Sequence, residues 1–285
     1  MTQRTIVLTG ASDGIGAAAA RALAERGDRV VVVGRSPEKT RAVAAPLDAP
    51  YHLADFARLD DVRALAAELN ESYPRIDVLV NNAGGIMGPR ASTQDGHELT
   101  FQFNHLGPFL LTHLLMDVLV ESGAAVINTS SAAARLFGRL DLDDLGNERR
   151  YTPEKAYGDG KLANILFTKE LHRRFADRGV STAAFHPGTV ATNFADGSSS
   201  HMRLIYRTPL RHVLLTRPEK GADTLVWLAT TEPGRDWTSG EYYEKRRPAR
   251  TNPQADDVAL ARGLWEASAD LVGVPDDDLP KITER

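Results

Sequence analysis

Tyr157 and Lys161 are the residues whose types and spacing suggest chemistry most directly. Because they are four positions apart, a helix would place both side chains on one face, roughly 5 to 6 Å apart at Cβ. A phenol titrates at about 10, and a neighbouring ammonium favours its phenolate form, so the pair could move a proton near neutral pH. The same spacing occurs often by chance as a surface pair. The surrounding sequence therefore has to show whether this pair is catalytic or lies on the surface by chance.

A serine pair stands where such chemistry would need a hydroxyl. Ser130 and Ser131 directly follow the strand predicted at residues 125–129. That end of the strand lies at the carboxyl edge of a parallel sheet, where doubly wound proteins bind their ligands. We therefore predict that Ser131 orients a substrate oxygen.

Pro108 lies inside the helix predicted at residues 98–120. Proline has no N–H, so it cannot bond the carbonyl of Asn104 four positions earlier. A buried acceptor needs a partner, and a water there, beside Lys161, would complete a proton path to solvent. A simple kink in the helix is the other interpretation, and the residues alone leave both open.

A glycine-rich turn joins the first predicted strand to an alanine-rich helix. Glycines there let the backbone turn sharply and approach a pyrophosphate, which would lie against the N–H groups and positive dipole of the helix. An ordinary strand-to-helix turn is the alternative. The residues predicted to bind a dinucleotide at this turn are Gly10, Ser12, Asp13, Gly14, Ile15 and Gly16.

The end of the second predicted strand indicates which dinucleotide is bound. An NAD-selective protein places an acidic residue there against the ribose hydroxyls, but this chain has Gly34. Arg35 and Ser36 follow, which supply a cation and a hydroxyl where a 2′-phosphate would lie. We therefore predict NADP(H), the alternative being that Arg35 only faces solvent.

Asp55 closes the third predicted strand, with Phe56 next to it. The carboxylate could accept a hydrogen bond from the exocyclic amine of adenine, and we count both residues as cofactor-binding. A helix N-cap is the competing interpretation of Asp55, and the two roles are compatible.

Short apolar runs alternate with helical patterns along the chain, as in βαβ units of a parallel sheet. No linker rich in Pro, Gly or Ser divides the first 190 residues, and the sequence has no internal repeat or low-complexity tract. We therefore predict one doubly wound domain over residues 1–285. The predicted strands are 6–9, 29–33, 51–53, 78–80, 125–129, 181–185 and 241–243. The predicted helices are 15–26, 59–70, 98–120, 157–177, 221–230 and 257–271.

Composition excludes several classes of protein. A formal charge of -4 with dispersed basic residues argues against a nucleic-acid partner. The absence of cysteine excludes disulfides, thiolate catalysis and Cys-based zinc sites, and the histidines show no metal-ligand pattern. The first strand begins too early to leave room for a signal peptide, and the longest apolar stretch is broken by polar residues. We expect a cytoplasmic protein with no membrane span and no metal.

From about Thr5 to about Gly273 the sequence resembles the short-chain dehydrogenase/reductase family, most closely its retinol-dehydrogenase-like branch. That likeness agrees with a Rossmann-like domain whose mainly parallel seven-stranded sheet has the order 3-2-1-4-5-6-7, with helices on both faces. The segments that carry the resemblance are 9–16, 81–84, 104–107, 131, 157–161 and 187–192.

The resemblance implies a catalytic tetrad of Asn104, Ser131, Tyr157 and Lys161, with Ser130 as the fallback serine. Tyr157 would protonate the nascent alkoxide, while Lys161 holds the nicotinamide ribose and lowers the tyrosine pKa. Asn104 would anchor the relay water. The other residues that the resemblance places at the cofactor are Asn82, Ala83, Gly84, Pro187, Gly188, Val190 and Thr192.

Two features depart from the common pattern of the family. Gly158 and Gly160 flank the predicted catalytic pair, and glycine weakens helices. Tyr157 follows Ser131 by 26 positions (157 − 131), a long spacing shared with the retinol-like branch. We expect the polar run 141–150 within it to form a surface loop near the site.

Residues 193–217 break the alternation of elements, and the family places a substrate lid there. Apolar residues at roughly helical spacing in this segment indicate an apolar, bulky substrate. A stripe of Arg203, Arg207 and Arg211 is either a solvated face or a contact for an anion or membrane surface. Residues 275–285 are expected to form a flexible tail.

The sequence thus predicts an NADP(H)-dependent oxidoreductase that transfers hydride between nicotinamide and a carbonyl or alcohol of a bulky apolar small molecule. Family habit suggests a homodimer or homotetramer. A non-catalytic NADP(H) sensor on the same fold is the main alternative, because fold does not determine function. An isomerase, dehydratase or epimerase with tightly held nicotinamide is the third.

Overall fold

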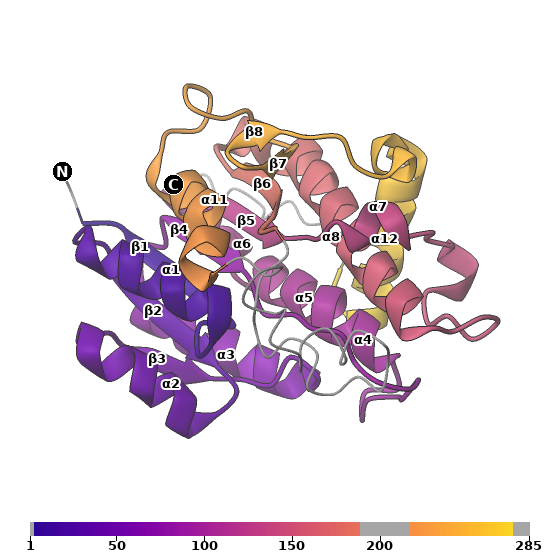
Figure 1. Cartoon of the computed structure of the whole chain (residues 1–285), viewed down its shortest axis with the longest axis horizontal. Coiled ribbons are helices and arrows are strands. Elements are labelled where there is room, and N and C mark those ends of the chain that lie inside the picture. Colours follow the sequence, from indigo (N-terminus) through magenta and orange to yellow (C-terminus); the bar gives the residue numbers. More distant parts are fainter. Residues whose placement is uncertain (1–2, 189–216, 276–285) are drawn as a thin grey trace.

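The computed structural model describes residues 3–188 and 217–275. The strands within these ranges form one sheet in the order β3-β2-β1-β4-β5-β6-β7-β8 (Figure 1). Neighbours are parallel except for β7 and β8. The strands are β1 (Thr5–Thr9), β2 (Arg29–Gly34), β3 (Tyr51–Leu53), β4 (Val78–Asn81), β5 (Ala125–Thr129), β6 (Ser181–His186), β7 (Glu241–Glu244) and β8 (Arg247–Pro248). The predicted strand order is confirmed, with one strand added at the edge.

β8 is the strand that the sequence analysis missed. It has two exposed residues and pairs antiparallel with β7 after a turn in which Lys245 and Arg246 have positive φ. A strand of this length has no room for an alternating apolar pattern, which is the signal that reveals strands in sequences.

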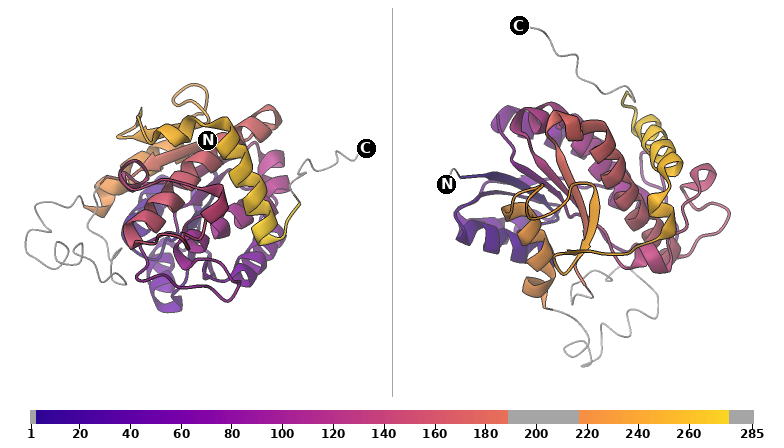
Figure 2. Two further views of the ribbon diagram at one scale, coloured as in Figure 1. Left: turned by 90° about the vertical axis from the view of Figure 1, so that its right-hand side faces the viewer. Right: turned by 90° about the horizontal axis from the view of Figure 1, so that it is seen from above.

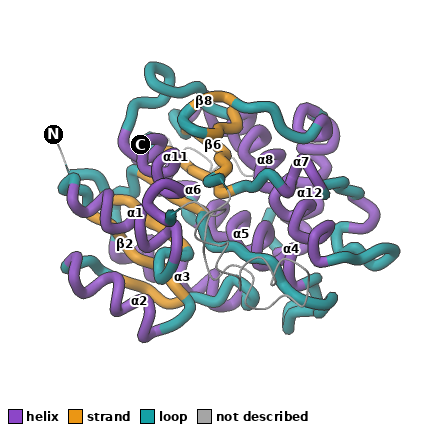
Figure 3. The backbone as a smooth tube through the Cα atoms, in the orientation of Figure 1, coloured by secondary structure: helices purple, strands orange, loops and turns teal. Residues whose placement is uncertain are grey.

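Helices cover both faces of the sheet, as predicted. In β1 the side chains of Ile6 and Leu8 join the core beneath α1 and α11, while Val7 joins the core beneath α3, α5, α8 and α12. Figures 2 and 3 show the strands lying between these two helical layers. The helices are α1 (Gly14–Glu25), α2 (Pro37–Ala44), α3 (Leu59–Ser72), α4 (Leu99–Phe101), α5 (Gly107–Leu114), α6 (Met116–Ser122), α7 (Ala133–Leu136), α8 (Pro153–Phe175), α11 (Pro218–Thr230) and α12 (Val258–Val272).

The single helix predicted at 98–120 is divided. Between α4 and α5 lies a π-turn, Gln102–Leu106, and the N–H of Gly107 bonds the carbonyl of Gln102 five residues earlier. Pro108 follows directly and supplies no donor. A second bend at Leu115 separates α5 from α6. The widened turn therefore lies where the proline interrupts the hydrogen-bond ladder.

α8, which carries the predicted catalytic pair, begins earlier than expected. The hydroxyl of Thr152 accepts from the N–H of Lys155, and Pro153 occupies the first turn. These are ordinary signals for the start of a helix, and they move it from residue 157 to residue 153. Tyr157 consequently lies in the second turn of a long, largely buried helix.

α12 packs along the outside of α8. The ring centroid of Trp265 lies 5.1 Å from that of Phe109 on α5 and 5.7 Å from that of Phe167 on α8. The guanidinium of Arg174 lies 4.7 Å from the centroid of the same indole. These contacts join the end of the chain to the helices that hold the site.

The predicted lid at 193–217, apart from Arg217, lies outside the described residues, as does the predicted tail after Pro275. In the described part, no single helix has the length and apolar character needed to cross a membrane, although Leu99–Leu114 and Met116–Ser122, bent by 63°, meet that test together. Within 3–188 and 217–275, no three His, Asp or Glu side chains gather as metal ligands would.

Candidate active site

Three chain segments meet around the ammonium group of Lys161. This side chain, on α8, is 1% exposed, and its Nζ donates to the carbonyl of Thr129 at the end of β5 at 3.2 Å. A β-carbon on Gly84 would lie 2.6 Å from that Nζ and 2.8 Å from Oδ1 of Asn104. The structure thus brings the predicted residues Asn104 and Lys161 together beside the segment that follows β4.

Tyr157 lies on the same side of α8 as Lys161. Its ring is buried, and its centroid is 5.6 Å from the lysine Nζ. Burial lowers the pKa of Lys161 to about 7, because the interior disfavours the charged ammonium. An anionic, hydroxyl-rich ligand beside it would favour the charged form. The ammonium and the phenol ring therefore lie side by side on one face of α8.

The two candidate serines have different roles. The hydroxyl of Ser130 is buried and donates to the backbone carbonyl of Lys161 at 2.7 Å. Ser131 is half-buried, and its hydroxyl accepts from the N–H of Ala133 at 3.2 Å. Accepting that bond leaves the Ser131 proton available to donate to a substrate oxygen. The geometry therefore favours Ser131 over Ser130.

The side chain of Asn104 is fully engaged with the protein. Its Nδ2 donates to the carbonyls of Gly85 and Thr100, each at 2.8 Å, and its Oδ1 accepts from the N–H of Gly85 at 3.0 Å. Its backbone carbonyl, in contrast, has Pro108 at the position of the usual helical donor. That carbonyl is the group of Asn104 best suited to hold a water.

The glycine turn closes against the segment after β4. Gly10 has φ of +62°, and a β-carbon on it would lie 2.8 Å from Cα of Ala83. Asp13 is the N-cap of α1, and its carboxylate accepts from the N–H of Gly14 at 2.7 Å. A compact turn leading into a helix N-terminus fits the pyrophosphate of a dinucleotide. These residues could therefore hold that part of a nicotinamide cofactor.

Asn82 ties the strand ends together. Its Nδ2 donates to the carbonyls of Thr9 at 3.0 Å and Gly10 at 3.2 Å, and its Oδ1 accepts from the hydroxyl of Thr129 at 3.3 Å. These bonds link the ends of β1, β4 and β5. The side chain of Asn82 thus serves the scaffold, although its position is at the predicted cofactor edge.

Basic residues gather where the second strand ends. Arg35 is 66% exposed, and its Nη1 lies 3.8 Å from Oδ2 of Asp55. The hydroxyl of Ser36 caps α2 by accepting from the N–H of Lys39 at 3.4 Å. Nζ of Lys39 lies 3.3 Å from the carboxylate of Asp13. The sequence analysis did not predict Lys39, because its contact with Asp13 joins residues 26 positions apart and appears only in the fold.

The N-cap interpretation of Asp55 is wrong. α3 begins after Arg58, and Asp55 instead accepts from the N–H of Ala57 at 3.0 Å in a local turn. The side chain of Phe56 is 2% exposed and packs in the core, where a β-carbon on Gly107 would lie 2.8 Å from its ring. Any cofactor contact by Phe56 would therefore use its backbone.

At the end of β6, Pro187 and Gly188 follow the strand at the same sheet edge, and Gly188 has a φ of +86°. Val190 and Thr192, the other two residues predicted to hold the nicotinamide amide, lie outside the described residues.

The glycines beside the predicted catalytic pair are sites of close packing. A β-carbon on Gly158 would lie 2.7 Å from the backbone nitrogen of Gly138, just after α7. One on Gly160 would lie 3.2 Å from Cβ of Asn104. α8 can therefore approach both neighbours closely, and α8 continues as one helix through both glycines despite their low helix propensity.

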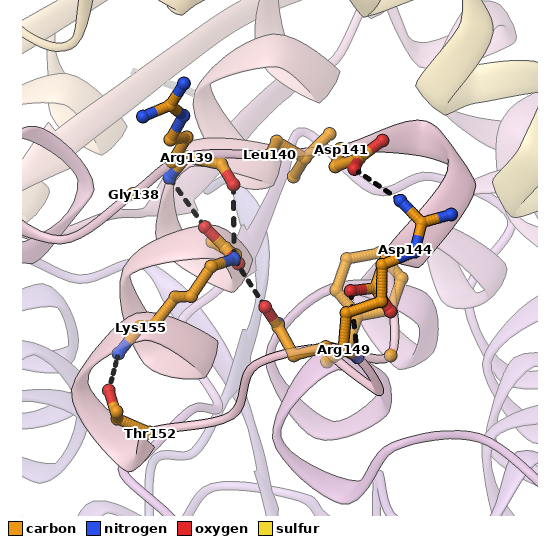
Figure 4. Close-up of polar contacts among 12 residues, drawn as sticks. Gly138, Arg139, Leu140, Asp141, Asp144, Arg149, Thr152 and Lys155 are labelled. Carbon is orange, nitrogen blue, oxygen red and sulfur yellow. Dashed lines mark hydrogen bonds and ion pairs between the residues drawn. The ribbon is translucent and has the colours of Figure 1, made fainter.

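The long segment between Ser131 and Tyr157 is fastened to α8 by hydrogen bonds to Lys155 and Asp159, which pair with each other within α8 (Figure 4). Asp159 accepts from the N–H of Arg139 at 2.7 Å and pairs with Nζ of Lys155 at 2.5 Å. The same Nζ donates to Oδ1 of Asn147 and to the carbonyl of Arg139. Burial raises the pKa of Asp159, while these bonds oppose that rise. Most of residues 141–150 are exposed or half-exposed, as expected of a surface loop, but Asn147 is buried.

Comparison with known proteins agrees with this geometry. The family model described as short chain dehydrogenase matches residues 4–203. The chain belongs to this family. A putative daunorubicin C-13 ketoreductase, DnrU, of Streptomyces sp. (strain C5) is 45% identical over 278 residues, covering 95% of this chain and 93% of its own. Human retinol dehydrogenase 13 is 37% identical over 293 residues, covering 99% and 87%. These relatives place this short-chain dehydrogenase in the retinol-dehydrogenase-like branch, among oxidoreductases that use nicotinamide cofactors.

Solved structures also match. A putative uncharacterized protein from Mycobacterium paratuberculosis superposes with a TM-score of 0.76 at 34% identity, covering 96% of this chain and 94% of that one. An NADP active-site complex of RhlG from Pseudomonas aeruginosa gives a TM-score of 0.68 at 26% identity, covering 85% and 94%. The fold of the chain is thus one that solved structures of this family share.

Proposed function

We propose that this short-chain dehydrogenase is an NADP(H)-dependent oxidoreductase that interconverts a ketone or aldehyde and the alcohol of a bulky, apolar small molecule. The observation that carries the proposal is the meeting of Lys161 and Asn104 at Gly84, with 2.6 and 2.8 Å to the position of a β-carbon. This packing brings a buried cation and an interrupted helix to the carboxyl edge of the sheet, where the family binds its cofactor.

In the direction of reduction, a bound nicotinamide cofactor would supply a hydride for the carbonyl carbon. Ser131 donates a hydrogen bond to the substrate oxygen, and Tyr157 gives its phenolic proton to that oxygen as negative charge develops there. Lys161, 5.6 Å from the ring centroid of Tyr157, stabilises the negative charge that remains on the phenol oxygen. The carbonyl of Asn104 holds a water through which the proton is replaced.

The preference for NADP(H) is supported by the groups around the end of β2. A β-carbon on Gly34 would lie 2.3 Å from the hydroxyl of Thr40 and 2.8 Å from Cβ of Ser12, so an acidic side chain does not fit there. Arg35 and Lys39 supply two largely exposed cations nearby. Both are suited to a 2′-phosphate.

Arg35→Asp tests the cofactor assignment. The substitution removes one cation and places a carboxylate against the 2′-phosphate, so we expect the ratio of Kd for NADPH to Kd for NADH to rise about tenfold or more, the size of one lost charged hydrogen bond. Binding is measured by fluorescence titration, with Arg41→Asp, on the following helix α2, as a control. Equal ratios in wild type and Arg35→Asp would contradict the assignment.

The substrate class is supported by exposed apolar side chains near the site. Leu136 and Phe137, in and just after the short helix that follows Ser131, are 64% and 48% exposed. The names of the relatives include daunorubicin and retinol, both bulky molecules with large hydrocarbon parts. Exposed apolar side chains five and six positions after Ser131 suit a molecule of this kind.

The direct test is NADPH oxidation measured over a panel of aromatic, polyketide-like, steroid-like and terpenoid ketones and aldehydes. We expect turnover with at least one bulky member. Tyr157→Phe should lower that turnover about 1,000-fold or more, because it removes the general acid. Turnover that survives this substitution would remove Tyr157 from the mechanism. NADPH binding without turnover of any member would indicate a sensor instead.

A further inference from the structure

His105 is the neighbour of Asn104 in the π-turn, but its side chain lies on the other side of the helix, in the core. It is fully buried, and its ring centroid lies 5.1 Å from that of Phe101 and 6.1 Å from those of Phe109 and Phe167. Two consecutive residues of one turn thus point in different directions, Asn104 toward the glycines after β4 and His105 toward α8 and α12. A polar ring among aromatic side chains requires hydrogen-bond partners.

Those partners form a chain that leads back to the active site. Nδ1 of His105 lies 3.4 Å from Oδ1 of Asn164, and Nε2 lies 2.9 Å from the hydroxyl of Ser268 on α12. Nδ2 of Asn164 donates to the carbonyl of Thr129 at 3.2 Å. The same carbonyl accepts from Nζ of Lys161, also at 3.2 Å. One backbone oxygen therefore joins the buried histidine to the predicted catalytic lysine.

The direction of every bond in this chain can be assigned from chemistry. The carbonyl of Thr129 can only accept, so the NH2 group of Asn164 faces it and Oδ1 faces His105. Nδ1 of His105 then carries the ring proton, and Nε2 accepts from the hydroxyl of Ser268. The histidine is neutral in this arrangement. Each polar atom of the chain has a partner of the opposite kind.

The surroundings of His105 agree with a neutral ring. The groups that face it from α8 and α12 are Asn164 and Ser268, and aromatic rings surround the rest; none of these carries a charge. Burial lowers the pKa of His105 to about 4. On the other side of Thr129, Tyr157 is the titratable side chain next to Lys161. The histidine thus keeps one protonation state over the working pH range.

We propose that His105 is a positioning residue: by orienting Asn164 it holds the carbonyl of Thr129 in place to receive the ammonium of Lys161. The inference rests on the proposed function, in which Lys161 supports Tyr157. Its physical basis is that a buried ammonium is stable only with a fixed acceptor, and the carbonyl of Thr129 is shared between the two donors.

Two substitutions distinguish the roles of the two ring nitrogens of His105. Asparagine places its amide donor close to the position of Nδ1, and glutamine places one close to Nε2. His105→Asn therefore keeps a donor for Asn164, whereas His105→Gln loses it and keeps only a group for Ser268. Both variants introduce an uncharged amide and similar polarity. A purely structural role predicts no systematic difference between them.

The primary readout is the titration of the Lys161 ammonium in the cofactor-free protein, followed by NMR of the lysine ε-carbons and assigned with Lys161→Met. We expect His105→Gln to lower the pKa of Lys161 by about 0.5 to 1 unit, because its charge-assisted bond to Thr129 is weakened. His105→Asn should leave that pKa within about 0.2 units of wild type, a smaller shift than weakening the bond to Thr129 would cause. Asn164→Leu should reproduce the effect of His105→Gln.

The second readout is kinetic. His105→Gln should lower kcat about tenfold and move the alkaline limb of the kcat/KM profile to lower pH, with KM for the carbonyl substrate nearly unchanged. His172→Asn is the matched control, because Nδ1 of His172 on α8 lies 2.9 Å from the hydroxyl of Ser239 in a histidine–serine pair away from Thr129. This control should leave the pKa of Lys161 as in wild type.

The outcomes separate the two proposals. If His105→Gln and His105→Asn give the same pKa of Lys161 as wild type and differ only in thermal stability, the positioning role is overturned. If Tyr157→Phe retains full turnover, the proposed function fails, whereas the NMR titration still tests the link between His105 and Lys161. Should His105→Gln not fold, Asn164→Leu supplies the same comparison, because it removes the donor to Thr129, adds no charge and leaves His105 in place.

Discussion

Nζ of Lys161 lies 2.6 Å from the point that a β-carbon on Gly84 would occupy. The end of β4 and the middle of α8 are therefore in contact through a position where even one methyl group does not fit. Because the same point is 2.8 Å from Oδ1 of Asn104, residue 84 is where the π-turn, the helix and the strand end are brought together.

Gly84→Ala tests that relationship. The added methyl has to displace the ammonium of Lys161 or the amide of Asn104, and a displacement of about 1 Å near a reacting group can cost about 100-fold in rate. We expect kcat/KM to fall by about that factor with a smaller change in Tm. Gly85→Ala, whose β-carbon would approach nothing more closely than 3.9 Å, is the control. Equal activities of the two variants would contradict the assignment.

Binding of NADPH should take up a proton above neutral pH. The pKa of Lys161 is lowered by burial to about 7, so at pH 8 the group is mostly neutral in the free protein. An anionic cofactor favours the charged ammonium and raises this pKa, so protons are bound between the free and bound values. Calorimetry in buffers of different ionisation enthalpy should show uptake approaching about one proton at pH 8 and little at pH 6. Lys161→Met should abolish the uptake, and persistence there would assign it to another group.

The two glycines of α8 should differ in their tolerance of alanine. At Gly158 a methyl group would meet backbone atoms of Gly138, Phe137 and Ala133 at 2.7 to 2.9 Å, which cannot move without shifting α7. Gly158→Ala should therefore destabilise the fold by about 1–3 kcal/mol despite its better helix propensity. At Gly160 the nearest atom is a side-chain carbon of Asn104 at 3.2 Å. Urea unfolding should show a smaller loss for Gly160→Ala, and the reverse order would contradict this account of the packing.

His105 should make the fold sensitive to acid. Burial lowers its pKa from 6.5 to about 4, so between these values the unfolded chain binds more protons than the folded one. The stability it contributes is complete above pH 6.5 and declines as the pH falls toward 4, by up to about 1.4 kcal/mol per pH unit. In unfolding experiments, the stability difference between wild type and His105→Asn should shrink by about 2 kcal/mol from pH 7 to pH 4.5. A constant difference would show that His105 is not the titrating group.

Much of the fold could be predicted because its signals are local. The buried valines of β2 are visible as an apolar run, and α1 is visible as helical spacing after the glycine turn; both elements form within one residue of the expected bounds. The elements that were predicted wrongly have sequence patterns that are too short or that fit more than one structure. β8 is only two residues long, and although Pro108 indicated an interruption of the helix, nothing in the sequence specified that it takes the form of a π-turn.

The candidate site shows the same division. Spacing alone places Tyr157 and Lys161 on one helix face, since four residues make about one turn. Spacing cannot show that the hydroxyl of Ser130 donates to the backbone carbonyl of Lys161, or that Lys39 lies beside Asp13. Such contacts join residues far apart in the chain, and their geometry follows from the packing of whole elements.

By itself, the sequence determined the parallel sheet, the glycine turn at its edge and the identity of the tyrosine and lysine, because periodicity and motif chemistry are properties of neighbouring residues. Tertiary structure decided which groups of those residues remain available for chemistry. Packing against Asn104 and Gly138 explains why α8 has glycines at 160 and 158, and burial sets the pKa of Lys161. The shared carbonyl of Thr129 also links that lysine to His105, because hydrogen bonds and burial depend on the distances between folded elements.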